Sequence, residues 1–199
     1  MFRNDILWLL PALLLALIQV KLIWPSQPEF DEADTEIKGT NTEYDILFLI
    51  YLQYIAYLLF IMQLFVPIFL ISRNFAIIFV LRIIGYLLTT AGFVISLLAL
   101  KTLGNNWTGM TDYRIKKGQS LIQNGVYKMI RHPIYCALIL EIMGFEFIAN
   151  SWLVIILTLG SLIIMNKQAN KEEELLTKKF GIEYQEYKST TKKIIPFLY

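Results

Sequence analysis

One stretch of the sequence leads from a polar segment into an apolar run that extends to Met165. It reads Asn124-Gly125-Val126-Tyr127-Lys128-Met129-Ile130-Arg131-His132-Pro133-Ile134-Tyr135. Asn124-Gly125 is a turn signal. Pro133 disfavours helical backbone at His132 and suits the first position of a helix. A helix is therefore predicted to begin at Pro133, with free N-H groups and a positive helix end that favour an anion.

The stretch over residues 133–165 is largely apolar and is broken at Asn150 and Ser151. This pattern predicts two helices joined by a tight turn, which form a membrane hairpin. Pro133 and Gln168 lie 17 residues before and 18 residues after Asn150, or about 26 and 27 Å along a helix. We therefore expect the polar motifs at the two ends of the hairpin to meet at one membrane face.

Composition places the whole chain among membrane proteins. Of its 199 residues, 56% are apolar and 17% are charged, and the mean hydropathy is +0.54, which excludes an aqueous enzyme. The net charge is only +2, and no basic cluster with aromatic residues suggests nucleic acid as a partner. A single cysteine and a single histidine cannot supply a structural zinc site or a covalent haem, so no metal is predicted.

Three further apolar segments, at residues 6–24, 46–71 and 75–100, are each long enough to cross about 30 Å of hydrocarbon. With the hairpin they predict an all-α integral membrane bundle of five transmembrane helices. Residues 1–100 form the three N-terminal spans and residues 101–199 a catalytic half. A signal peptide is the alternative for residues 6–24, but Trp24-Pro25-Ser26-Gln27 offers no small-residue cleavage site.

Most of the 18 Lys and Arg residues lie in residues 25–45, 101–132 and 166–199, which five spans place on one side of the membrane. The positive-inside rule puts this side, with the C-terminus, in the cytoplasm and the N-terminus outside. The acidic segment 25–45 contains two prolines and no apolar periodicity. It is predicted to be a solvated linker without a function.

Residues 166–180 have a helical pattern that Gly181 is expected to end. Gln168 and Glu172 are four residues apart and so lie on one helix face. Glu141 falls in the middle of the fourth span, where a carboxylate facing lipid is costly. It is therefore expected to face the bundle and is a candidate for the substrate pocket.

At these residues the chain resembles the isoprenylcysteine carboxyl methyltransferase family, especially its prokaryotic branch. This family belongs to the small integral-membrane methyltransferases, which include phospholipid N-methyltransferases. The resemblance covers about half of the chain, and the leading spans are similar only in kind. Its motif residues are Gly125, Tyr127, Arg131, His132, Pro133 and Tyr135, then Glu172, Glu173, Leu176, Phe180, Gly181, Tyr184, Tyr187 and Pro196.

The resemblance implies that S-adenosyl-L-methionine is the cofactor, bound at a cytoplasmic site in the C-terminal half. Glu172, His132 and Gln168 would be the catalytic residues, and Gln168 and Glu141 would contact the substrate. The family has an arginine at the position of Gln168, and a neutral amide cannot pair bidentately with a carboxylate. The cofactor residues that the resemblance implies are Gln119, Ser120, Leu121, Ile122, Tyr127, His132, Pro133, Ile134, Tyr135 and Glu172.

The implied reaction is carboxyl or other O- or N-methylation of an isoprenoid or lipid-like acceptor, which would enter from the bilayer. Methyl transfer mainly needs alignment and exclusion of water, whereas an amine or hydroxyl acceptor also needs a base, for which His132, Glu172 and Glu141 are candidates. One alternative is a phospholipid N-methyltransferase. A second is an NADPH-dependent reductase of the sterol reductase type, although those reductases usually have asparagine where Ile134 stands. A third is a non-enzymatic membrane scaffold or transporter. The sequence leaves the oligomeric state open.

Overall fold

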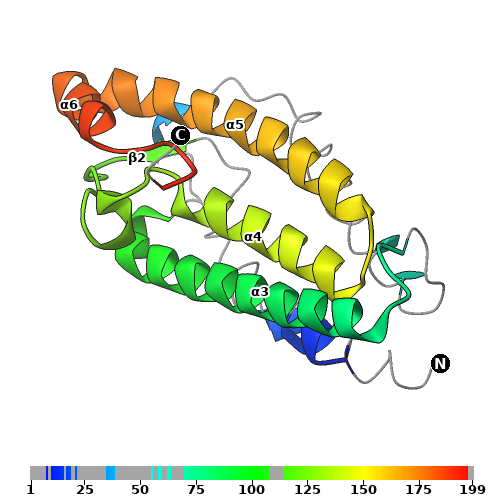
Figure 1. Cartoon of the computed structure of the whole chain (residues 1–199). Helices are drawn as coiled ribbons and strands as arrows, with labels where there is room; N and C mark the ends of the chain where they lie inside the picture. The colour runs from blue at the N-terminus through cyan, green and yellow to red at the C-terminus, as the bar shows by residue number, and fades with distance from the viewer. Residues whose placement is uncertain are drawn as a thin grey trace.

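Three helices with roughly aligned axes, the middle one antiparallel to the other two, dominate the structure, a computed structural model (Figure 1). The described part of the chain comprises residues 8, 10–15, 17–18, 21, 35–38, 55, 58–59, 62–63, 70–107 and 114–196. Its elements are β1 (Thr35–Lys38), α3 (Phe75–Leu103), η2 (Gly104–Asn106), β2 (Arg114–Lys116), η3 (Gly125–Lys128), α4 (Pro133–Ile148), α5 (Leu153–Phe180) and α6 (Ile182–Thr190).

Helix α3 confirms the helix predicted over residues 75–100 and extends it by three residues. The side chain of Asn74 caps its start by accepting hydrogen bonds from the N-H groups of Ala76 (2.9 Å) and Ile77 (3.3 Å). Its end lies at Gly104, whose φ of +50° suits glycine. The helix boundaries therefore follow from ordinary capping chemistry.

Helices α3 and α4 pack backbone against backbone. A Cβ atom on Gly92 would lie 2.6 Å from the carbonyl oxygen of Ala137, and one on Gly144 would lie 2.2 Å from Oγ1 of Thr89. Only glycine allows so close an approach, as is common between apolar helices. The pair α3–α4 is thus a closely packed unit that carries the start of α4 at a fixed place.

Helix α4 begins at Pro133, as predicted, and His132 before it has a non-helical φ of −122° and ψ of 63°. Helix α5 continues without a break to Phe180, so residues 166–180 extend the apolar helix instead of forming a separate one. Gly181 ends it with a φ of +55°, which confirms the predicted stop. In the turn between α4 and α5, Asn150 has a φ of +57°.

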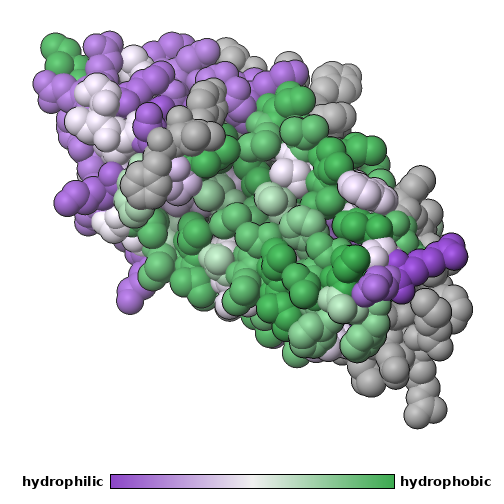
Figure 2. Space-filling view, in the orientation of Figure 1, coloured by the Kyte–Doolittle hydropathy of each residue, from purple (hydrophilic) through white to green (hydrophobic). Residues whose placement is uncertain are grey.

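Two of the described helical segments, residues 75–106 and α5, are long and apolar enough to cross a membrane. Figure 2 shows apolar side chains over the middle of the molecule and hydrophilic ones at the end that holds α6. Many large apolar side chains on α3 and α5, such as Leu87 and Ile156, are exposed, as lipid contact requires. The spans predicted at 6–24 and 46–71 lie largely outside the described residues, so the five-span count stays a prediction.

A two-stranded antiparallel sheet corrects two expectations. β1 pairs with β2, so the protein is mostly helical instead of all-α, and residues 35–38 of the acidic segment are not part of a solvated linker. Ile37 packs against buried Ile115 and Leu175, and Glu36 forms an ion pair with Lys179. A strand of four residues is too short to show an alternating pattern in the sequence.

The segment after α6 returns to the start of α4. The N-H of Arg131 donates to the carbonyl of Lys192 (2.8 Å), and the N-H of His132 donates to that of Lys193 (3.0 Å). Ile194 is 1% exposed and packs with Cys136 and Ile139 of α4. Residues 192–194 therefore fix the His132-Pro133 turn.

Candidate functional site

The imidazole of His132 lies between two carboxylates. Its Nδ1 is 3.1 Å from Oε2 of Glu172, and its Nε2 is 3.4 Å from Oε1 of Glu173. The ring is almost fully buried. The two motifs predicted to meet, one at the start of α4 and one on α5, are thus in direct contact.

Tyr135 completes the support of Glu172. Its hydroxyl donates a hydrogen bond to Oε1 of Glu172, while its ring stacks on that of His132 with centroids 5.4 Å apart and planes 7° apart. Each oxygen of the Glu172 carboxylate therefore has a donor from the start of α4. The Glu172 side chain keeps 31% of its surface exposed, so it also faces a cavity.

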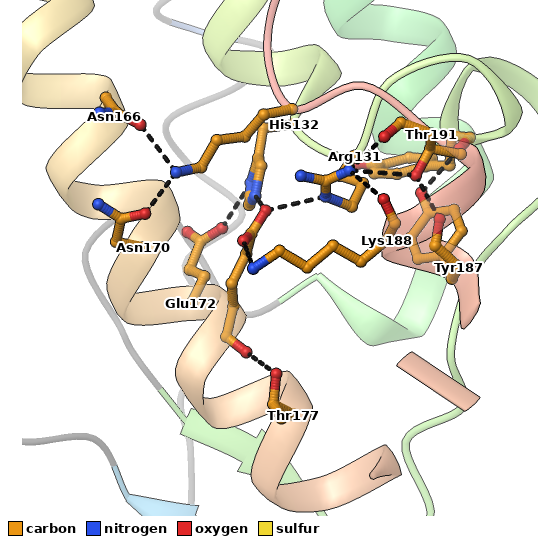
Figure 3. A network of polar contacts seen from close by, with 12 residues as sticks. Arg131, His132, Asn166, Asn170, Glu172, Thr177, Tyr187, Lys188 and Thr191 are labelled. Atoms are coloured by element: carbon orange, nitrogen blue, oxygen red, sulfur yellow. Dashed lines mark hydrogen bonds and ion pairs between the residues drawn. The ribbon is translucent and has the colours of Figure 1, made fainter. Parts of the chain in front are cut away.

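Glu173 is the buried anion of this site. Its carboxylate contacts the Nε of Arg131 (2.8 Å) and the Nζ of Lys188 (2.7 Å), and Arg131 also donates to the carbonyl of Lys188 (3.1 Å). Figure 3 shows how this network draws α5, α6 and the turn before α4 together. Burial alone would raise the pKa of Glu173, but hydrogen bonds from His132, Lys188 and Arg131 hold it well below its usual range.

His132 is expected to carry a positive charge. Burial lowers its pKa, but hydrogen bonds and charge interactions with Glu172 and Glu173 outweigh burial and raise the pKa above the ordinary 6.5. An imidazolium with both nitrogens directed at carboxylates has no lone pair to accept a proton. This arrangement favours the charged form of the ring and directs both of its nitrogens at carboxylates.

Lys193 ties the C-terminal segment to α5 beside this network. Its ammonium donates to Oδ1 of Asn166 (2.7 Å) and to Oδ1 of Asn170, one turn apart on α5 (Figure 3). The ammonium is thereby held by two neutral amides.

A cavity opens at the start of α4, between α5, α6 and the loop after α3. All the residues that the resemblance implies for the cofactor line it. These are Gln119, Ser120, Leu121, Ile122, Tyr127, His132, Pro133, Ile134, Tyr135 and Glu172.

The two residues expected to contact substrate lie elsewhere. Gln168 is buried on α5, one turn before Glu172, and does not line this cavity. Glu141 is 3% exposed and faces the α3–α4 interface, where its Cγ would be 2.7 Å from a Cβ on Gly92. Glu141 does face the helix bundle as expected, but at a distance along α4 from His132.

Several residues of the cavity were missed as site residues from the sequence alone. Arg131, Tyr184 and Tyr187 were recognised only as motif members, and Trp107 was not named as a site residue. Tyr187 supports the cavity by donating to the carbonyl of Tyr127 (2.7 Å). The Tyr-x-x-Tyr spacing on a helix, which puts both rings on one face, was the available signal.

Two buried polar atoms in the cavity wall have no hydrogen-bond partner among the described residues. They are Nε1 of Trp107 and the hydroxyl oxygen of Tyr184. Tyr184 is 0% exposed, and a buried polar group without a partner costs free energy. Both atoms fit a site that is completed by a polar ligand.

The fold and the site together define a mostly helical protein that has two apolar candidate membrane spans and a polar binding cavity at one end. The model of the phospholipid methyltransferase family matches residues 80–183, which include most of α3 and all of α4 and α5. The chain belongs to this family.

Similar proteins are isoprenylcysteine methyltransferases. The probable protein-S-isoprenylcysteine O-methyltransferase of Oryza sativa subsp. japonica is 29% identical over 116 residues, which are 58% of this chain and 61% of the relative. Protein-S-isoprenylcysteine O-methyltransferase A of Arabidopsis thaliana is 24% identical over 115 residues, 57% and 58% of the two chains. The chain thus spans less than two thirds of the length of these curated relatives.

A solved structure is similar as well. The eukaryotic intramembrane Ras methyltransferase, isoprenylcysteine carboxyl methyltransferase, aligns with a TM-score of 0.56 and 28% sequence identity. The alignment covers 59% of this chain and 43% of that one. The family assignment and the fold likeness therefore agree on a membrane methyltransferase architecture.

Proposed function

We propose that this protein is an S-adenosyl-L-methionine-dependent membrane methyltransferase that methylates the carboxylate of a prenylated or similarly lipid-like acceptor. The family match and the isoprenylcysteine methyltransferase relatives support methyl transfer. The same comparisons favour methyl transfer over the reductase alternative. The observation that carries the choice of a carboxylate is the His132 ring held between Glu172 and Glu173.

The donor set of the cavity fits the cofactor. The first-turn N-H groups of α4 suit a methionyl carboxylate, and the partly exposed Glu172 can accept hydrogen bonds from an ammonium group or from ribose hydroxyls. Apolar side chains such as Leu103 and Leu176 line the cavity and suit an adenine ring. When bound, the cofactor supplies an electrophilic methyl group on a sulfonium.

The residues of the site would position the reactants and exclude water. A carboxylate acceptor is already deprotonated, so the transfer needs no proton acceptor. His132, with both nitrogens facing carboxylates, cannot supply one, and both oxygens of Glu172 already accept from His132 and Tyr135. What remains for the protein is alignment and desolvation, which can provide most of the acceleration.

Phospholipid N-methylation is the second candidate. The name of the matching family favours it, as does the neutral side chain of Gln168 where the prenylcysteine enzymes have arginine. An amine acceptor must lose a proton, and among the described residues that line the cavity His132 and Glu172 are already engaged with each other and with Glu173 and Tyr135. This difference in proton chemistry makes the carboxylate the better-supported acceptor.

We also propose that the cavity faces the cytoplasm and that the acceptor reaches it from the bilayer. Figure 2 shows hydrophilic side chains at the end that holds α6. The positive-inside rule places the basic residues of the C-terminal segment 166–199 in the cytoplasm. The apolar surfaces of α3 and α5 would lie in lipid. A lipid-like tail could then stay in the membrane while its polar head reaches the cavity.

The test uses the full chain in lipid nanodiscs with S-adenosyl-L-methionine carrying a labelled methyl group. Acetylfarnesylcysteine and phosphatidylethanolamine serve as acceptors, and the matching prenylcysteine methyl ester is the control without a free carboxylate. A product that releases labelled methanol in alkali is an ester and supports the proposal. Label only in phosphatidylethanolamine would overturn it in favour of N-methylation.

A further inference from the structure

Tyr184 and Trp107 lie in different parts of the chain but line the same cavity. Tyr184 belongs to α6, and Trp107 follows η2 at the end of α3. The site motifs described above do not assign a ligand to either residue. Their side-chain polar atoms are nevertheless buried without a partner in the described part of the chain.

Contacts with the backbone and with the indole ring fix the position of Trp107. The ammonium of Lys116 donates to the carbonyls of Asn105 (3.0 Å) and Trp107 (3.3 Å). The indole packs against a buried cluster formed by Ala99, Tyr127 and Ile134. Its N-H can only donate, so the complementary ligand atom is an acceptor in flat, apolar surroundings, such as a ring nitrogen of a purine.

Tyr184 lies on the charged side of the cavity. Its ring contacts that of Tyr187 edge to face, with centroids 6.0 Å apart. Burial raises its pKa, and the nearby carboxylates of Glu173 and Glu172 raise it further, so the hydroxyl stays protonated. A ligand hydroxyl there can accept from Tyr184 and donate to Glu172, which is the pattern that a ribose provides.

We propose that Trp107 and Tyr184 bind the adenosine part of the methyl donor, with the Trp107 N-H donating to the purine ring and the Tyr184 hydroxyl donating to a ribose hydroxyl. This inference rests on the proposed function, because it assigns residues to the same cofactor. It explains why these two polar groups are buried without partners among the residues that the structure describes. The unfavourable burial is relieved when the ligand binds.

The first test measures binding of S-adenosylhomocysteine and adenosine by isothermal titration to the full chain in nanodiscs. Tyr184→Phe and Trp107→Phe are each expected to weaken binding about 3- to 10-fold, the usual range for one neutral hydrogen bond. Wild-type affinity in both folded variants overturns the inference. Failure of the wild type to bind either ligand contradicts the proposed function instead.

Melting of the ligand-free protein provides a second readout. Tyr184→Phe removes a hydroxyl that has no hydrogen-bond partner in the described part of the chain, so the melting temperature should stay the same or rise. Tyr187→Phe is the matched control: it deprives the Tyr127 carbonyl of its donor and should lower the melting temperature. A Tyr184→Phe variant that melts earlier than Tyr187→Phe would show that the Tyr184 hydroxyl serves the fold and not the ligand.

Ligand analogues test the same contacts without any substitution. The wild type should bind 2′-deoxyadenosine or 3′-deoxyadenosine about 3- to 10-fold more weakly than adenosine. For the hydroxyl that matters, the deoxy ligand and Tyr184→Phe together should cost little more than either change alone. Equal affinity of the wild type for adenosine and for both deoxy ligands would exclude the ribose contact.

Discussion

The carboxylates of Glu172 and Glu173 lie on opposite sides of one imidazole ring, although the two residues are consecutive on α5. Glu172 contacts Nδ1 of His132 at 3.1 Å and Glu173 contacts Nε2 at 3.4 Å. Their surroundings differ: Glu172 is 31% exposed toward the cavity, whereas Glu173 is 4% exposed and faces Arg131 and Lys188. The pair therefore divides into a ligand-facing carboxylate and a structural one.

Replacement of Glu172 should affect ligand binding more than folding. We expect Glu172→Ala to weaken binding of S-adenosylhomocysteine by about 1.5 to 3 kcal/mol, the usual size for hydrogen bonds to a charged group. The melting temperature without ligand should fall less than that of Glu173→Gln, because Glu172 is the more exposed of the two carboxylates. Isothermal titration and thermal unfolding of the same preparation check both values, and unchanged affinity in a folded variant would contradict the cofactor role of Glu172.

Replacement of Glu173 should affect the stability of the fold more than ligand binding. Glu173→Gln leaves Arg131 and Lys188 beside a neutral group, and breaking such a buried ion pair costs about 3 to 5 kcal/mol. Unfolding monitored by circular dichroism should therefore begin at a lower temperature. Glu174→Gln, an exposed neighbour on the same helix, is the matched control; equal stability of the two variants would count against the buried network.

His132 should make stability depend on pH in a defined direction. Its pKa in the folded protein is raised above the ordinary 6.5, so the stabilisation is complete below about pH 6.5 and is lost as the pH rises through the folded value. The melting temperature should fall over that window. In His132→Gln this fall should be absent, and a wild type whose stability rises there would refute a charged His132.

Activity should also need His132, because the ring positions Glu172. His132→Ala is expected to lower methyl transfer strongly while expression changes less, since Pro133 and not His132 starts the helix. Turnover and yield of membrane-inserted protein provide the comparison. Full turnover in the variant would restrict His132 to a structural role.

Gln168 tests the nature of the acceptor. If the acceptor is a carboxylate, Gln168→Arg should lower the apparent substrate constant by up to about 10-fold, which corresponds to 1.4 kcal/mol. With an amine or neutral lipid, the buried cation should suppress activity. Initial rates on a prenylcysteine analogue and on phosphatidylethanolamine decide between them, and a variant identical to wild type on both would show that Gln168 does not face the substrate.

The contact between α3 and α4 predicts a contrast between two glycines. Gly144→Ala places a methyl group 2.2 Å from Oγ1 of Thr89 and should cost about 1 to 3 kcal/mol through overpacking. Gly160→Ala on α5 meets nothing within 4 Å and should stabilise the helix by up to about 1 kcal/mol. Thermal unfolding in one detergent compares the two, and equal shifts would contradict the close packing.

The sequence predicted those elements whose signals are local. Pro133 marks a helix start and Gly181 a helix stop because proline and glycine restrict or widen the backbone angles directly. The meeting of His132 with Glu172 followed from counting residues along two helices from Asn150. Such arithmetic works because the rise of a helix is constant.

Other features depend on contacts between distant residues and were not predictable. β1 is held by its pairing with β2 and by the packing of Ile37 on Ile115, and neither contact is encoded within four residues. The burial of Tyr184 likewise depends on how α6 folds back after Gly181. Periodicity places such a ring on a helix face but does not show what that face contacts.

The pairing of residues 131–132 with 192–193 determines when the site is completed during protein synthesis. The ribosome makes α3 and α4 first, and these helices can pack while the rest of the chain is still being translated. Until residue 193 has been synthesised, the turn at His132 lacks its backbone acceptors and Glu173 lacks Lys188. A nascent chain can therefore insert and pack its apolar helices early, while the cavity takes shape only after translation has passed its last contributing residue.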